Sequence, residues 1–151
     1  TGIVIPKRRS ALPTSTVMRT SAGAIARIPV VGVVNASRAL KEFKEKGFWI
    51  MGLDHGAEKI LWECEFPEKV VLVIGSEGCG ISRLTRENCD FLVRIPMKGH
   101  TGSLNAAAAG AIGMYEWFRT LSKRWIETHG NTGPGGACAG CSPVDKPRGR
   151  G

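Results

Sequence analysis

The sequence has no apolar run long enough to cross a membrane, and it has only three histidines and one tyrosine among its 151 residues. We therefore expect a soluble protein, and 42% hydrophobic content can support one domain with a real core. The histidines, His55, His100 and His129, are scattered. Their spacing favours neither a metal site nor a histidine-based nucleophile relay.

Acidic residues are missing from the first 41 positions, and the first one is Glu42. The tail from Thr128 contributes +2 of the formal charge of +8, which leaves +6 on the body. Such a basic block suits a polyanion, RNA or DNA, although a merely solvated basic face is the alternative. The basic residues before Glu42 are Lys7, Arg8, Arg9, Arg19, Arg27, Arg38 and Lys41.

Cysteine is scarce and odd in number, with five residues spread through the chain. This usage predicts reduced thiols and a cytoplasmic protein without structural disulfides. Cys138 and Cys141 form a C-x-x-C, but a zinc site needs about four ligands, and His129 adds a third at best. We expect no metal, and we interpret residues 128–151 as a disordered Gly/Pro-rich tail after a domain of residues 1–127.

Short apolar runs alternate with helical patterns along the body, which predicts an α/β fold: a mostly parallel sheet with helices on both faces. A helical pattern also covers 14–26, a second helix is expected over 37–47 with Ser37 as its N-cap, and a third over 82–89. The expected strands are 2–6, 29–34, 48–54, 69–75 and 90–96.

A long final helix is predicted over 103–126. Its apolar residues repeat at helical spacing, so we expect them to form its buried side. They are Leu104, Ala108, Ala111, Ile112, Tyr115, Phe118 and Trp125.

The stretch "VVLVIGSEGCGISRLTREN" reads as strand, glycine loop and helix. Gly75 and Gly80 have P-loop spacing, but Ile81 stands where the lysine must be, so nucleotide hydrolysis is disfavoured. The order G-x-x-G-x-G also differs from the dinucleotide pattern. Because Glu77 would repel phosphate but could accept hydrogen bonds from hydroxyls or an amine, the loop suits a nucleoside that carries an amino-acid-like group.

A second glycine-bearing segment, "RIPMKGHTGSLNAAAAGAIGMYEW", is the expected opposite wall of that site. Ser103 and Asn105 fall at the opening turn of the final helix, where free N–H groups can hold a polar ligand. The small residues 106–113 permit close approach. The alternative is a capped helix whose small face serves packing alone.

These segments, with "GIVIPKRRSA" and "GFWIMGLD", resemble the SpoU/TrmH branch of the SPOUT RNA methyltransferases over residues 1–117. The closest likeness is to the enzymes that 2′-O-methylate a guanosine of 23S rRNA. The resemblance implies a C-terminal trefoil knot, an exception to unthreaded chains. It also implies S-adenosylmethionine as cofactor, a homodimer, a role in rRNA processing, and RNA as partner, rRNA more than tRNA.

The resemblance also implies roles for individual residues. Glu77, Ser103 and Asn105 match the family's functional polar positions and are the candidate catalytic residues. Lys7, Arg8 and Arg9, at the end of the first strand, would contact RNA phosphates. The expected cofactor contacts are Gly75, Ser76, Gly78, Ile95, Met97, Ser103, Leu104 and Asn105.

The chain also departs from the family pattern. The family carries an Asn and a catalytic Arg on a strand–helix unit just before the segment equivalent to "TGIVIP", and none of Arg8, Arg9 or Arg19 matches that Arg. We expect a fragment of a longer protein, the alternative being a short form that cannot catalyse alone. The missing strand would expose apolar surface, and the alanine run after Asn105 is smaller than usual. A non-catalytic RNA-binding protein on the same scaffold is the competing hypothesis.

Overall fold

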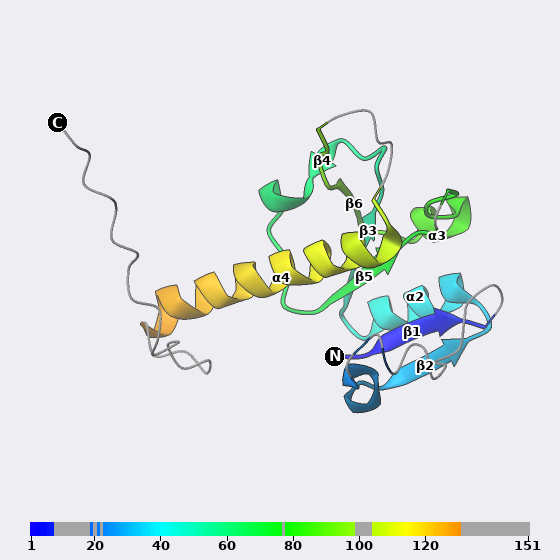
Figure 1. The fold of residues 1–151 in the computed structure, drawn as a ribbon, viewed down its shortest axis with the longest axis horizontal. Helices are drawn as coiled ribbons and strands as arrows, with labels where there is room; N and C mark the ends of the chain where they lie inside the picture. Colours follow the sequence, from blue (N-terminus) through cyan, green and yellow to red (C-terminus); the bar gives the residue numbers. More distant parts are fainter. Residues whose placement is uncertain (8–18, 20, 22, 77, 99–103, 131–151) are drawn as a thin grey trace.

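The computed structural model describes residues 1–7, 19, 21, 23–76, 78–98 and 104–130. Every paired strand in this part of the chain runs parallel to its neighbours. Strands β1 (Ile3–Pro6) and β2 (Val30–Val33) form one small sheet. A larger sheet has the order β4-β6-β3-β5, with β3 (Trp49–Leu53), β4 (Lys59–Ile60), β5 (Val70–Ile74) and β6 (Phe91–Arg94). The α/β class expected from the sequence is confirmed (Figure 1).

The larger sheet is covered on both faces, and the two faces can be told apart along β3. Side chains alternate between faces along a strand. Gly52 faces Ile81 and Cys89, which flank helix α3 (Arg83–Glu87), whereas Leu53 lies against Gly113 of helix α4 (Ala106–His129). Figure 1 shows α4 lying across the sheet beside β5. Within the described residues, no helix has the length and apolar character needed to cross a membrane.

The N-cap of helix α2 (Ala36–Glu45) lies two residues earlier than the sequence suggested. This N-cap is Asn35, whose side chain accepts a hydrogen bond from the Arg38 N–H at 3.0 Å, so the expected Ser37 cap is wrong. An amide oxygen at Asn35 satisfies the same free N–H groups that a serine hydroxyl would. Ser37 instead lies in the first turn, and the helix stops before Gly47, whose φ is 79°.

Asp90 ties α2 to the sheet. Its carboxylate accepts hydrogen bonds from Lys44 Nζ at 2.7 Å and from the Ile50 N–H at 2.8 Å. Burial alone would raise the pKa of this carboxyl, but the two hydrogen bonds and the lysine charge outweigh it and lower the pKa. The contact therefore favours the ionised carboxylate.

The predicted buried side of α4 is largely wrong. Gly110 and Gly113 are its buried residues, and an added Cβ at Gly113 would lie 3.1 Å from Leu53 Cδ1. The helix therefore approaches the sheet closely through glycines, and several of its large apolar residues are left outside. Several residues expected to be buried are exposed: Ala108, Ala111, Ile112, Tyr115 and Phe118, the last three at 40%, 67% and 61%.

A cluster of buried hydrophobic residues lies on the α4 side of β3 and β6. Met51 and Val93 pack there with Leu61 of the 3-10 helix η2 (Leu61–Glu63) and with Phe66, all at 1% exposure or less. Trp117 of α4 packs against this cluster and donates its indole N–H to the Pro67 carbonyl at 3.3 Å. The sequence patterns predicted neither β4 nor η2.

Two expectations fall mostly outside the described residues. Of the helical pattern over 14–26, the structure describes a 3-10 helix, η1 (Ala24–Arg27), at its end. The trefoil knot depends on the connection from β6 to α4, in which residues 99–103 lie outside the described part. The knot stays a prediction.

Candidate functional site

A cavity of about 460 Å³ lies at the carboxyl ends of β3, β5 and β6, where open parallel sheets bind their ligands. Its volume is within the range of small-molecule sites. The lining combines apolar side chains, glycine backbone and a few polar groups. It consists of Leu53, Asp54, His55, Ile74, Gly75, Ser76, Gly78, Gly80, Arg94, Ile95, Met97, Leu104, Ala106 and Ala109.

The glycine loop after β5 closes on itself. Ser76 and Gly80 exchange backbone hydrogen bonds of 3.1 and 2.9 Å, and Gly78 and Gly80 have φ values of 82° and 64°. A Cβ at Gly75 would lie 2.3 Å from the Gly80 carbonyl carbon. Glycine is therefore required at Gly75 by a close backbone contact and at the other two positions by backbone conformation.

Ile81 explains why this loop is not a P-loop. Its side chain is 5% exposed and points into the sheet, with Cδ1 2.9 Å from where a Cβ of Gly52 would lie. The position that would carry the phosphate-binding lysine is therefore used for packing. The interpretation that nucleotide hydrolysis is disfavoured gains a structural reason.

The start of α4 forms the opposite wall. Asn105 is the N-cap, and its side chain accepts a hydrogen bond from the Ala107 N–H at 2.8 Å. Leu104, Ala106 and Ala109 line the cavity, so the alanine run keeps the helix surface close to it. The helix begins at Ala106 instead of the expected 103.

Three ionisable lining residues were not among the predicted site residues: Asp54 and His55 after β3, and Arg94 at the end of β6. Asp54 is buried, and its Oδ1 accepts a hydrogen bond from the Gly56 N–H at 2.9 Å. Its Oδ2 forms an ion pair with Arg86 Nη2 at 2.5 Å, while His55 Nδ1 lies 3.9 Å from Oδ1. Their position at the carboxyl ends of apolar strands was the signal that could have found them.

The structure brings six of the predicted cofactor residues to one cavity. Asn105 is exposed beside the cavity and is not part of its lining. Glu77, Ser103, Arg8 and Arg9 lie outside the described residues, as do Cys138 and Cys141. Lys7 is exposed, and its aliphatic stem packs over Gly32 of β2. The six are Gly75, Ser76, Gly78, Ile95, Met97 and Leu104.

The cysteines near the site differ in environment. Cys79 is exposed in the glycine loop, whereas burial raises the pKa of the Cys89 thiol to about 11. Among the described residues, no group of three or more His, Cys, Asp or Glu side chains is placed to hold a metal ion.

Known RNA methyltransferases resemble this chain over most of its length. Residues 1–115 match the model of the SpoU rRNA Methylase family. An uncharacterized tRNA/rRNA methyltransferase of Synechocystis is 52% identical over 118 residues, which cover 78% of this chain and 31% of that protein. YacO of Bacillus subtilis, named as a TrmH family tRNA/rRNA methyltransferase, is 48% identical, with 78% and 47% covered.

Solved structures show the same fold. The SpoU methyltransferase AviRb of Streptomyces viridochromogenes, in complex with the cofactor AdoMet, superimposes with a TM-score of 0.73 at 26% identity, covering 80% of this chain and 48% of AviRb. The TrmH/SpoU tRNA modifying enzyme of A. aeolicus gives 0.70 at 26% identity, with 87% and 66% covered. This chain spans less than half the length of the two curated relatives. It belongs to the SpoU rRNA methylase family.

Proposed function

We propose that this chain binds S-adenosylmethionine in the cavity and forms the methyltransferase part of an enzyme that 2′-O-methylates a ribose in RNA, a guanosine of 23S rRNA. The observation that carries the proposal is the convergence of the glycine loop and the start of α4 on one cavity. Both segments carry the family motifs. The AdoMet complex of AviRb, a related fold, supports the choice of cofactor.

The cavity fits a cofactor with adenosine and amino-acid ends. Leu53, Ile95 and Met97 offer apolar surface to a base, and the glycine loop offers backbone groups at close range. Arg94 brings a half-buried cation that suits a carboxylate. When bound, the cofactor supplies a methyl group on a sulfonium. The chain's contribution is to position that group against the ribose oxygen.

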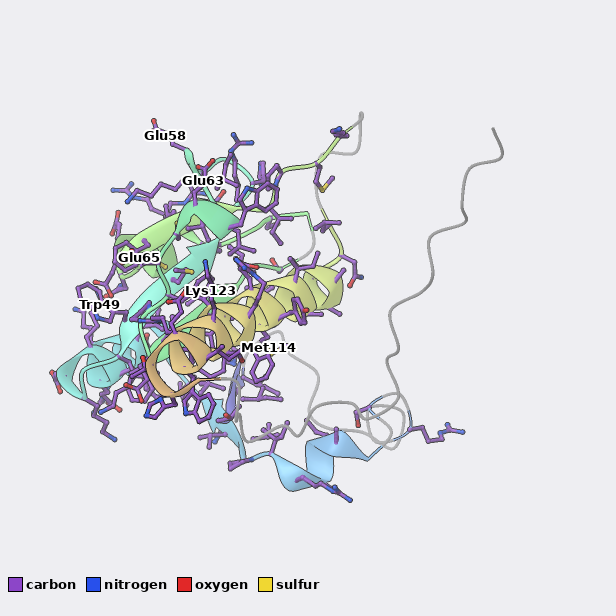
Figure 2. All side chains as sticks on the ribbon, turned by 90° about the vertical axis from the view of Figure 1, so that its left-hand side faces the viewer. Trp49, Glu58, Glu63, Glu65, Met114 and Lys123 are labelled. Carbon is purple, nitrogen blue, oxygen red and sulfur yellow. The ribbon has the colours of Figure 1, made fainter. Side chains whose placement is uncertain are left out.

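Charge separation supports an RNA face on the β1–β2–α2 side. Exposed basic residues there include Lys7, Lys41 and Arg38, of which Arg38 pairs with Glu42 of the same helix at 3.0 Å. Acidic side chains lie on another part of the molecule: Figure 2 shows Glu58, just before β4, and Glu63 and Glu65, between β4 and β5, on one side of it. An RNA backbone would be attracted to the first region and repelled by the second.

The outer side of α4 supports pairing of two copies. Ile112, Met114, Tyr115 and Phe118 are each at least 40% exposed along this helix. Contiguous apolar side chains on a surface mark interaction sites. A homodimer that covers them completes the proposal.

Calorimetric titration tests the cofactor site. We expect the chain to bind S-adenosylmethionine and not ATP, and Asn105→Ala to weaken that binding roughly tenfold, because losing the N-cap loosens the turn beside the cavity. Asn35→Ala is the matched control, since it removes the N-cap of α2, away from the cavity. Equal affinity in the Asn105 variant would contradict the assignment. Binding of neither ligand would favour the non-catalytic RNA-binding alternative.

The RNA face is tested by the salt dependence of binding. Replacing Arg8 and Arg9 by alanine is expected to weaken RNA binding and reduce the slope of log K against log salt by about 1.4 to 1.8, since each phosphate contact adds about 0.9 for duplex and 0.7 for single strands. Affinity for S-adenosylmethionine should not change. Lys123→Ala is the control, because this exposed residue lies near the C-terminal end of α4 (Figure 2). An unchanged slope in the double variant would rule out this face.

A further inference from the structure

Asp54 is the one charged residue that is buried among those the structure describes, and the proposed transfer does not use it. Its side chain is 3% exposed and lies at the carboxyl end of β3, in the wall of the cavity. A buried carboxylate is costly unless it is paired. Its partners therefore indicate what this position does.

The two carboxylate oxygens are engaged differently: Oδ1 accepts a hydrogen bond, whereas Oδ2 has an ion pair that lacks hydrogen-bond geometry. Oδ1 accepts the Gly56 N–H, which fixes the turn after β3, and the main chain of Asp54 donates to the Val93 carbonyl of β6 at 2.9 Å. Oδ2 has the Arg86 guanidinium at 2.5 Å. Arg86 is on α3, so the pair joins the end of β3 to the helix that follows the glycine loop.

Helix α3 needs such an anchor. It has five residues, which is too short for a helix to be stable by itself. Its N-terminal end connects to the loop through Ser82, whose carbonyl accepts the Arg86 N–H at 2.8 Å. Ile81 fixes the loop end by packing, and the ion pair fixes the following turn. The described loop residues, 75–76 and 78–80, are thus followed by two fixed points, Ile81 and Arg86.

A second arginine on the same helix shows the contrast. Arg83 pairs with Glu87 at 2.8 Å, but these side chains are 90% and 53% exposed and belong to one helix. Exposed pairs of this kind contribute little and position nothing outside the helix. The Asp54–Arg86 pair instead has a buried anion and joins segments 32 positions apart in the sequence.

We propose that Asp54 and Arg86 are positioning residues, and that their ion pair holds the described residues of the glycine loop, 75–76 and 78–80, in the conformation that binds the cofactor. The inference rests on the proposed function for the identity of that cofactor. The effect of the ion pair on the conformation of the loop does not depend on which cofactor binds. In this proposal the pair acts through the loop and takes no part in the transfer itself.

The test combines hydrogen exchange with calorimetry on Asp54→Asn, Arg86→Gln and the double variant. Asn keeps an acceptor for the Gly56 N–H, so the change removes mainly the charge. We expect amides of residues 75–89 to exchange roughly tenfold faster, and affinity for S-adenosylmethionine to fall roughly tenfold in each single variant. The double variant should be no weaker than either single one, because one interaction is lost in all three.

Two further variants separate positioning from general stability. Arg86→Lys keeps a cation and should recover part of the affinity, and Arg83→Gln should match the unaltered chain in exchange and binding. In the assembled enzyme, the KM for the cofactor should rise while the KM for RNA stays unchanged. Unchanged hydrogen exchange in residues 75–89, or additive losses of affinity in the double variant, would overturn the proposal that the Asp54–Arg86 pair positions the loop. Faster exchange with unchanged affinity would overturn its link to the cofactor.

Hydrogen exchange measured without ligand tests the role of the ion pair separately from the cofactor assignment. If the unaltered chain does not bind S-adenosylmethionine, the cofactor assignment fails. The exchange rates of residues 75–89 still decide whether the pair holds the loop.

Discussion

Gly75→Ala is expected to weaken S-adenosylmethionine binding by about 100-fold or more, which corresponds to about 2.7 kcal/mol. A Cβ at this position would lie 2.3 Å from the Gly80 carbonyl carbon and 2.6 Å from both the Gly80 oxygen and the Ile81 nitrogen. These are backbone atoms, so no side-chain rotation can relieve the overlap. The loop must open, and the paired hydrogen bonds between Ser76 and Gly80 break with it.

Calorimetry measures the loss of affinity, and thermal unfolding measures the accompanying loss of stability, expected at about 1 to 3 kcal/mol for an overpacked site. Gly56→Ala is the matched control. There a Cβ would meet Asp54 Oδ1 at 3.5 Å, an ordinary contact, and alanine keeps the amide donor. Binding by the Gly75 variant as tight as by the control would mean that the loop opens without harm and does not form the cofactor wall.

All the described strands except β4 could be predicted from the sequence, because each of these is an apolar run bounded by glycine, proline or charge. Residues 69–75 are the clearest case, and β5 occupies Val70–Ile74. The face of α4 could not be predicted in the same way. Hydrophobic periodicity assumes that large apolar residues point inward, but Gly110 and Gly113 pack against Ile74 and Leu53. Close approach between backbone and sheet leaves no hydrophobic signal in the sequence.

Only the parts of the site that local motifs encode could be predicted from the sequence. The glycine loop and the start of α4 carry local motifs, and the structure places residues from both in one cavity. Asp54 and Arg94 belong to strands that become neighbours through the order β4-β6-β3-β5. That order comes from crossovers between distant segments, which local patterns do not encode. Arg86 illustrates this: in the sequence it is one of several helix arginines, and only the fold pairs it with a buried carboxylate.

Phe66→Ala is expected to lower the free energy of unfolding by about 3 to 5 kcal/mol, the largest effect on stability of a single change predicted for this chain. The ring is 1% exposed and packs with Met51, Leu61 and Val93. Since a domain is stable by only about 5 to 15 kcal/mol, such a loss removes much of its margin. Urea denaturation measures it.

The expected loss of stability has a second cause besides the cavity that the substitution leaves in the core. The Phe66 carbonyl accepts a hydrogen bond from Arg124, and the neighbouring Pro67 carbonyl accepts one from Trp117, so this loop supports the C-terminal half of α4. The first turn of the same helix lines the cofactor cavity. Trp62→Ala, in the same segment but 55% exposed, should change stability by about 0.5 kcal/mol or less. Equal losses in the two variants would mean that the segment contributes surface coverage alone and does not hold α4 in place over the core.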